Sequence, residues 1–130
     1  MRKMSEYFTE SHEWVRLEDD NIGLIGLTNY AQAELGDIVF VDLPTVGKHV
    51  AINDPIAVIE SVKVASDINA PISGTIIAVN ERLSSAPQLV NESPDTNGWL
   101  LRIKLDHPAQ LEALMNKDTY NALITNIVGE

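Results

Sequence analysis

Short runs rich in Val, Ile and Leu recur along most of the chain, and Gly, Pro, Asn and Asp separate them. β-branched residues favour pleated strands, and turn residues keep each strand to a few residues. Many short strands separated by turns predict a small barrel or sandwich. The strands predicted on this basis cover residues 14–18, 22–27, 38–42, two pieces within 50–59, 75–79 and 99–105.

Two segments carry helix signals instead. Thr28 can cap the N-terminus of a short helix, and Gly36 can supply the left-handed residue that closes it. Asp106 predicts the start of a later helix, with Pro108 in its first turn and an apolar stripe at 111, 114 and 115. A second helix is predicted from Asp118. The expected fold is mainly β, with a short internal helix and a C-terminal helical segment at about 106–128.

Size and charge narrow the class of protein. The chain has 130 residues, 45% of them hydrophobic, so a single domain over residues 1–130 is expected. Nineteen acidic against nine basic residues give a formal net charge of -10, which disfavours nucleic acid and anionic membranes and favours partners with basic surfaces. No apolar run approaches the roughly 20 residues of a membrane span. The first residues do not resemble a transit peptide, so a cytoplasmic protein of a bacterial cell is expected.

Common catalytic and metal-binding patterns are absent from the sequence. It has no cysteine, and His12, His49 and His107 lie on separate segments without metal-ligand spacing, so no metal site is expected. Gly47-Lys48 resembles the end of a phosphate-binding loop, but His49 stands where Ser or Thr belongs. Any sulfur chemistry therefore has to come from a bound group.

The run Ile56–Ser66 contains no Gly, Pro, Asn or Asp, although strands typically hold only about 5 to 6 residues. A chain reversal is therefore expected near Val62 and Lys63. β-branched Val resists the positive φ that two-residue hairpins favour, so such a tip would break a local rule. Val58, Ile59, Val62 and Ala65 also fit one face of a short helix. From the residues alone both structures stay open, and the pattern favours the helix.

The segment Glu60-Ser61-Val62-Lys63, with Ser66-Asp67 and residues 70–74 after it, resembles the lipoyl-attachment region of the glycine cleavage system H-protein family. The resemblance extends from about residue 7 to residue 120, and so many motifs in the same order are specific. The other matching segments are 11–15, 30–32, 35–41, 43–44, 89–91 and 98–100.

The resemblance implies the barrel-sandwich hybrid fold of lipoyl and biotinyl domains, with Lys63 exposed at a hairpin tip. It further implies that (R)-lipoate is joined to Lys63 as an amide, and that the protein is a carrier rather than an enzyme. Its implied partners are glycine decarboxylase (P-protein), aminomethyltransferase (T-protein) and dihydrolipoyl dehydrogenase (L-protein), which load, unload and reoxidise the carrier. A lipoate ligase or lipoyl transferase is implied as well, and the carrier is expected to be a monomer.

Four further residues are candidates around this attachment point. The resemblance also implies that the loaded carrier bears an ammonium group and is sensitive to water, and such a cargo would be sheltered by a cleft that contains carboxylates. We expect Glu13 and Asp67 to line that cleft, with Ser11 as a hydrogen-bonding neighbour. We also expect Glu60, together with Asp67, to be read by the enzyme that recognises the hairpin.

Three alternatives share parts of this pattern. A biotinyl carrier usually has Met on both sides of its lysine, whereas Val62 and Val64 flank Lys63 here. A lipoyl domain of a 2-oxoacid dehydrogenase normally has Asp before its lysine, and this chain has Val62. A lipoate relay or scaffold without glycine chemistry would carry the same hairpin, so the sequence leaves that function open.

Overall fold

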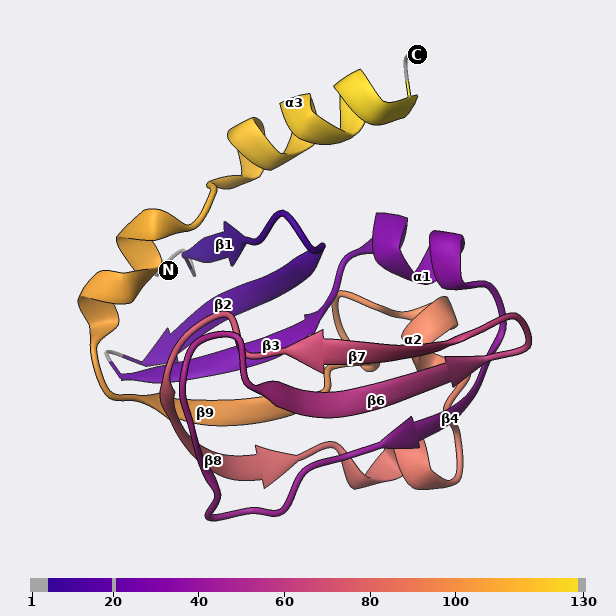
Figure 1. Cartoon of the computed structure of the whole chain (residues 1–130), viewed down its shortest axis with the longest axis horizontal. Helices are drawn as coiled ribbons and strands as arrows, with labels where there is room; N and C mark the ends of the chain where they lie inside the picture. Colours follow the sequence, from indigo (N-terminus) through magenta and orange to yellow (C-terminus); the bar gives the residue numbers. More distant parts are fainter. Residues whose placement is uncertain (1–4, 20, 129–130) are drawn as a thin grey trace.

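The computed structural model describes residues 5–19 and 21–128, which form two antiparallel β-sheets (Figure 1). The six-stranded sheet has the order β1-β2-β3-β9-β8-β5, and the three-stranded sheet has the order β4-β6-β7. The strands are β1 (Glu6–Phe8), β2 (Glu13–Asp19), β3 (Ile22–Leu27), β4 (Ile38–Asp42), β5 (His49–Val50), β6 (Pro55–Ser61), β7 (Ala65–Asn69), β8 (Gly74–Val79) and β9 (Leu101–Leu105).

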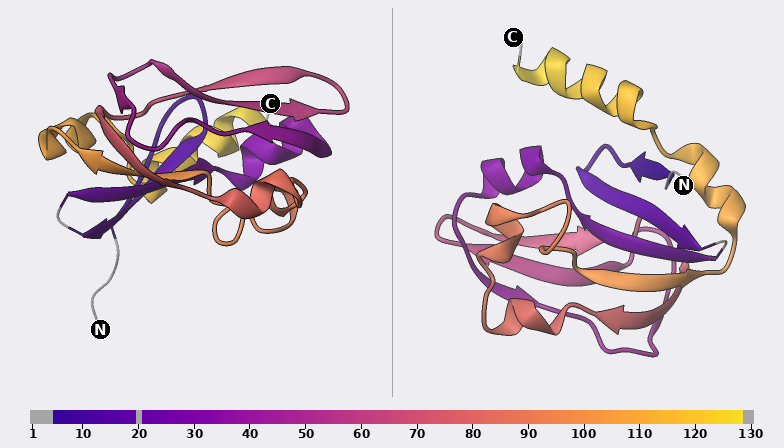
Figure 2. Two further views of the ribbon diagram at one scale, coloured as in Figure 1. Left: turned by 90° about the horizontal axis from the view of Figure 1, so that it is seen from below. Right: turned by 180° about the vertical axis from the view of Figure 1, so that it is seen from behind.

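The helices are short and lie at the ends and edges of the sheets (Figures 1 and 2). They are α1 (Asn29–Leu35), the 3₁₀ helix η1 (Glu81–Ser84), α2 (Leu89–Glu92), the 3₁₀ helix η2 (Pro108–Ala113) and α3 (Lys117–Val128). Within the two described ranges, none of these helices is long and apolar enough to cross a membrane.

One main core contains side chains from both sheets. Val15 and Ile25 of the larger sheet are fully buried, as are Ile59 of the smaller sheet and Ile72 between β7 and β8. Burial of such side chains stabilises a fold by about 1.5–3 kcal/mol each. The mainly β fold predicted from the alternation of short apolar runs and turns is therefore confirmed.

The predicted internal helix is confirmed with its caps. The Thr28 hydroxyl oxygen accepts a hydrogen bond from the Ala31 amide (3.2 Å), which satisfies one free N–H of the first turn. Gly36 closes α1 at φ 84°, a left-handed conformation that residues with a side chain rarely adopt. The chain then turns directly into β4.

The segment after β9 differs from the prediction. Residues 108–113 form a 3₁₀ helix rather than the start of an α-helix, and Leu114 and Met115 lie beyond it. Asp106 does not cap this helix, because its carboxylate pairs with the His49 ring. Met115 instead forms a backbone bridge with Phe8 of β1. The second predicted helix is present, and it begins at Lys117.

A second, smaller cluster attaches α3 to the outside of the larger sheet. Phe8 and Tyr120 stack with ring centroids 4.8 Å apart, and Trp14 and Leu24 are buried beside them. The Trp14 indole donates to the carbonyls of Leu27 (2.8 Å) and Pro94 (3.1 Å). The C-terminal helix is thus anchored near the start of β2.

Candidate functional site

Lys63 lies at the tip of the hairpin formed by β6 and β7, which projects from one end of the molecule (Figure 1). Glu60 faces Ala65 in the last pair of the ladder, and the Ser61 amide donates to the Val64 carbonyl (2.8 Å). The residues of the run 56–66 thus form two strands and a turn. The prediction of a short helix, which the apolar spacing favoured, is therefore wrong.

A serine hydroxyl allows valine and lysine to occupy this turn. The Ser61 hydroxyl oxygen accepts from the amides of Lys63 (3.1 Å) and Val64 (3.2 Å), in the place of a backbone carbonyl. In the described ranges, His12 and Asn53 are the only non-glycine residues with positive φ, so Val62 and Lys63 keep ordinary backbone angles. The strained tip expected from the sequence is therefore avoided.

The Lys63 side chain is exposed and crosses the end of α1. A Cβ atom added to Gly36 would lie 3.0 Å from Cε of Lys63 and 3.7 Å from its Nζ. Among the residues that the structure describes, Nζ takes part in no ion pair. The amine is therefore accessible, while its stem rests on a glycine that leaves room for it.

A cleft of about 240 Å³ lies between α1, β7 and the start of β2, and its lining includes Leu35, which directly precedes the glycine under Lys63. Three of the residues singled out from the sequence line it, namely Ser11, Glu13 and Asp67. Glu60 does not line it and lies exposed on β6. The rest of the lining is His12, Leu27, Ala31, Glu34, Leu35, Ser66, Ile68 and Asn69.

Glu13 is the buried acid of this cleft, with only 4% of its surface exposed. Its Oε1 accepts from the Thr9 hydroxyl (2.6 Å), and the same Thr9 oxygen accepts from the Glu13 amide (3.0 Å). Burial raises the pKa of the Glu13 carboxyl, and the Thr9 hydrogen bond opposes this shift. Asp67, by contrast, is exposed on the edge strand β7.

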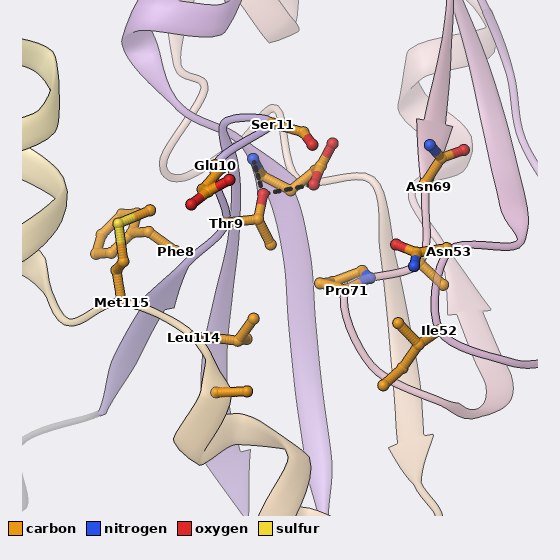
Figure 3. Close-up of a pocket in the computed structure, with 13 residues that line it drawn as sticks. Phe8, Thr9, Glu10, Ser11, Ile52, Asn53, Asn69, Pro71, Leu114 and Met115 are labelled. Atoms are coloured by element: carbon orange, nitrogen blue, oxygen red, sulfur yellow. Dashed lines mark hydrogen bonds between the residues drawn. The ribbon is translucent and has the colours of Figure 1, made fainter.

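A second hollow of about 280 Å³ adjoins the cleft (Figure 3). Ser11, Glu13 and Asn69 line both, so the two hollows meet at the buried carboxyl. In Figure 3 Thr9 and Ser11 lie near the centre, Asn69 lies to the right of them, Met115 lies to the left, and Leu114 lies below Thr9. The loop before β2 therefore forms a wall common to both hollows.

His12 is a residue of the cleft that the sequence analysis considered only as a metal ligand. It has φ 74°, and its Nδ1 lies 2.9 Å from the Tyr120 hydroxyl, which lies 2.7 Å from Thr28 Oγ1. Its ring also packs against Tyr30 at 4.7 Å between centroids. Burial lowers the pKa of His12, so the neutral imidazole is favoured. Through His12, the C-terminal helix thus holds the loop that contains Ser11 and that leads into β2 at Glu13.

Of the other lining residues that the sequence analysis did not single out, Glu34 and Asn69 are polar, and Leu27, Ala31, Leu35 and Ile68 are apolar. Ala31 and Leu35 are four residues apart on α1, so they lie on one face of the helix, and Leu27 ends β3 beside them. This spacing is the signal that could have identified a helix face turned toward a cleft. Within residues 5–19 and 21–128, no cluster of His, Asp and Glu could hold a metal ion.

Comparison with known proteins assigns the family. The glycine cleavage H-protein family model matches residues 6–127. The glycine cleavage system H protein of Photorhabdus laumondii is 53% identical over 117 residues, 90% of each chain. That of Rhodospirillum rubrum is 46% identical over 118 residues, which cover 91% of this chain and 94% of the relative.

A solved structure supports the same assignment at the level of the fold. The crystal structure of a glycine cleavage system H protein from Mycobacterium marinum superposes with a TM-score of 0.84 at 29% identity, and covers 99% of this chain and 100% of that one. The fold is thus the barrel-sandwich hybrid, as the resemblance implied. Family membership implies the P-, T- and L-proteins of the glycine cleavage system as partners, and this family typically carries lipoyl-lysine. The chain belongs to the glycine cleavage H-protein family, the non-catalytic lipoyl carriers of the glycine cleavage system.

Proposed function

We propose that Lys63 is the residue that carries the lipoyl group, joined as an amide to its Nζ. The observation that carries this proposal is an exposed lysine amine at the tip of a hairpin, which forms no ion pair with the residues that the structure describes and lies near a carboxylate-lined cleft. Lysine suits the role because its ammonium can lose a proton and form an amide, whereas arginine stays protonated. The cleft begins at Leu35, directly before the glycine under the Lys63 stem.

Bound at Lys63, the lipoyl group supplies a disulfide that can accept the aminomethyl group derived from glycine. We further propose that the cleft shelters this cargo. Leu27, Ala31 and Leu35 offer an apolar wall for a hydrocarbon arm, and the carboxyls of Glu13, Glu34 and Asp67 offer acceptors for an ammonium group.

The chain's own residues would then orient the cargo and limit its contact with water. The Tyr30 hydroxyl donates to Glu34 Oε1 (2.9 Å), which holds that carboxylate at the edge of the cleft. The favoured neutral form of His12 adds no positive charge to the lining. Ser11 is placed to donate or accept a hydrogen bond beside Glu13. These features suit a cationic cargo, for which an acidic, partly enclosed surface is favourable.

We further propose how the carrier is modified and where it works. A lipoate ligase or lipoyl transferase modifies Lys63, and the exposed Glu60 and Asp67 take part in recognition of the hairpin. Residues 1–130 act as one lipoyl-carrier domain, as a monomer in the bacterial cytoplasm. The relatives named above are bacterial proteins of nearly the same extent, which supports this setting.

Reconstitution with glycine decarboxylase tests the assignment of Lys63. The lipoylated chain should support exchange of the glycine carboxyl group with bicarbonate, and Lys63→Arg should abolish that exchange while the fold is retained. Lys48→Arg alters another exposed lysine and serves as the matched control, with exchange unchanged. Exchange by Lys63→Arg at the wild-type rate would contradict the proposal. Full lipoylation without any exchange would instead support the lipoate relay.

A further inference from the structure

β4 exposes two consecutive apolar residues beside the Lys63 hairpin. In a regular strand successive side chains point to opposite faces, so only one of two neighbours should be exposed. Here Val39 is 54% exposed and Phe40 is 50% exposed, whereas Ile38 and Val41 are buried. Neighbouring exposed apolar residues form a patch rather than an isolated side chain, and such patches mark interaction sites.

A bulge in β4 produces this exposure. Ile38 faces Ser61 and Phe40 faces Glu60, so two steps along β4 correspond to one step along β6. The extra residue is Val39, and the bulge turns it outward together with Phe40. Bulges often lie next to functional sites, where they redirect side chains.

The bulge is rigidly supported and closely tied to the tip of the hairpin. The Val62 amide donates to the Asp37 carbonyl (3.0 Å), which joins the tip to the start of β4. The Ile38 amide donates to Asn91 Oδ1 (2.9 Å), which fixes the strand immediately before the bulge. The exposed side chains therefore keep a defined position relative to Lys63.

Two more exposed apolar residues flank the lysine itself. Val62 is 68% exposed and Val64 is 48% exposed. We call Val39, Phe40, Val62 and Val64 the apolar rim. Exposed carboxylates lie around it, and the pairing of the strands places Glu60 beside Phe40 and places Asp42 and Asp67 on either side of Val58. A complementary surface would be apolar at its centre and basic at its edge.

We propose that the apolar rim is the docking surface for the enzyme that joins the lipoyl group to Lys63. This inference rests on the proposed attachment at Lys63. An enzyme that forms a bond at Nζ has to bring its reacting carbon to the tip of the hairpin, and so it contacts the residues that flank the tip. Enzymes that act on the sulfur atoms work at the far end of the arm, where contact with the rim is not required.

The reaction at this surface is an acyl transfer without oxidation or reduction. The Lys63 ammonium loses one proton to water, and the neutral Nζ attacks the carbonyl carbon of an activated lipoyl group, such as its mixed anhydride with a nucleotide phosphate. The amide C–N bond forms, and Nζ releases a second proton to water. The bond from the carbonyl carbon to the phosphate oxygen breaks, and its electron pair leaves with the phosphate. Binding of the enzyme to the apolar rim holds the hairpin in a position from which Nζ can reach that carbon.

The experiment measures lipoylation of the unmodified chain by purified lipoate ligase with lipoate and ATP, followed by intact mass. Phe40→Ser should lower kcat/KM for the protein substrate by about tenfold, mainly through KM, because aromatic anchors dominate binding at interfaces. Val46→Ser removes an apolar side chain of similar exposure (53%) on another loop and should leave kcat/KM unchanged. Asp42→Lys should also raise KM, and added salt should reduce its difference from the wild type.

The outcomes separate this inference from the assignment of Lys63. Lipoylation of Lys63 at equal rates in the wild type, Phe40→Ser and Asp42→Lys would overturn the docking surface while the attachment stands. A wild-type chain that gains no lipoyl group at Lys63 would overturn both. Once lipoylated, Phe40→Ser should be reoxidised by dihydrolipoyl dehydrogenase at the wild-type rate. A wild-type dimer that Phe40→Ser dissociates would assign the rim to a second copy and overturn the proposal.

Discussion

Glu13 and Asp67 line the same cleft but differ in their surroundings. Glu13 is buried and accepts a hydrogen bond from Thr9, whereas Asp67 is exposed on β7. Burial favours the neutral form of a carboxyl, so the raised pKa of Glu13 places its ionisation at a higher pH than that of an ordinary surface acid. An ammonium group entering the cleft would favour the carboxylate, because opposite charges attract strongly where water is scarce.

This difference gives a pH-dependent prediction for the loaded carrier. Below the raised pKa of Glu13 its carboxyl is protonated and cannot pair with the cargo, and above it the carboxylate forms. The lifetime of the loaded wild type relative to Glu13→Gln should therefore rise as pH increases through that pKa. The measurement is release of the aminomethyl group from both purified proteins between about pH 5 and pH 9.

Comparison with the Gln variant cancels the intrinsic pH dependence of the release reaction, because both proteins carry the same cargo. The variant keeps an oxygen that can accept from Thr9, so its fold should be retained. A ratio of lifetimes that stays at one across the whole range would remove Glu13 from the proposed role.

Asn91 connects three elements around the lysine. Its Nδ2 donates to the Gly36 carbonyl (2.9 Å) and to Gln32 Oε1 (2.9 Å), while its Oδ1 accepts from the Ile38 amide (2.9 Å). The side chain therefore holds the end of α1 and the start of β4 to α2. No local propensity fixes this arrangement, and the connection is made entirely by tertiary hydrogen bonds.

Removal of these bonds should destabilise the protein. Asn91→Ala should cost about 2–3 kcal/mol of unfolding free energy, because three half-buried backbone and side-chain groups lose their partner together. Denaturant unfolding measures the change. Asn97→Ala alters an exposed asparagine on a nearby loop and should cost less than about 0.5 kcal/mol. Equal losses in the two variants would show that Asn91 has no special structural role.

The elements that could be predicted from the sequence are those with local signals. Thr28 and Gly36 mark both ends of α1, and β-branched runs mark most strands. The Lys63 turn could not be predicted from periodicity, because the Ser61 hydroxyl and the Asp37 carbonyl that support it act through the folded hairpin. The resemblance to a family supplied what the residues alone left open.

The cleft, too, could be predicted only in part from the sequence. Ser11, Glu13 and Asp67 could be named from the resemblance, but the burial of Glu13 follows from packing that no local pattern encodes. The contact of His12 with Tyr120 joins residues 108 positions apart, so it depends on where α3 docks. Capping and strand signals are local, whereas the walls of a site depend on long-range packing.

At the scale of the whole molecule, the negative net charge helps a carrier that must meet several enzymes in turn. The net charge of -10 creates a long-range field that attracts basic docking surfaces without tight binding. Surface ion pairs such as Arg102–Glu18 leave this net charge unchanged, because it already counts both partners. Diffusional encounters of this kind become slower when salt screens the field.

The rate of loading by glycine decarboxylase should therefore fall several-fold as salt is raised from about 0.01 M to about 0.15 M, at carrier concentrations well below saturation. Free lipoamide, which lacks the acidic protein surface, is the control for effects of salt on the enzyme itself. Loading of the carrier that depends on salt no more than loading of free lipoamide would argue against electrostatic steering.

The attachment of a lipoyl group to Lys63 is the claim on which the carrier mechanism of this chain depends. Intact mass and peptide mapping after expression in a host that makes lipoate test it most directly. We expect the mass increment of one lipoyl amide, located on the peptide that contains Lys63 and absent from the Lys63→Arg variant. An increment on another lysine, such as Lys48, or its persistence in Lys63→Arg would show that Lys63 is not the attachment site.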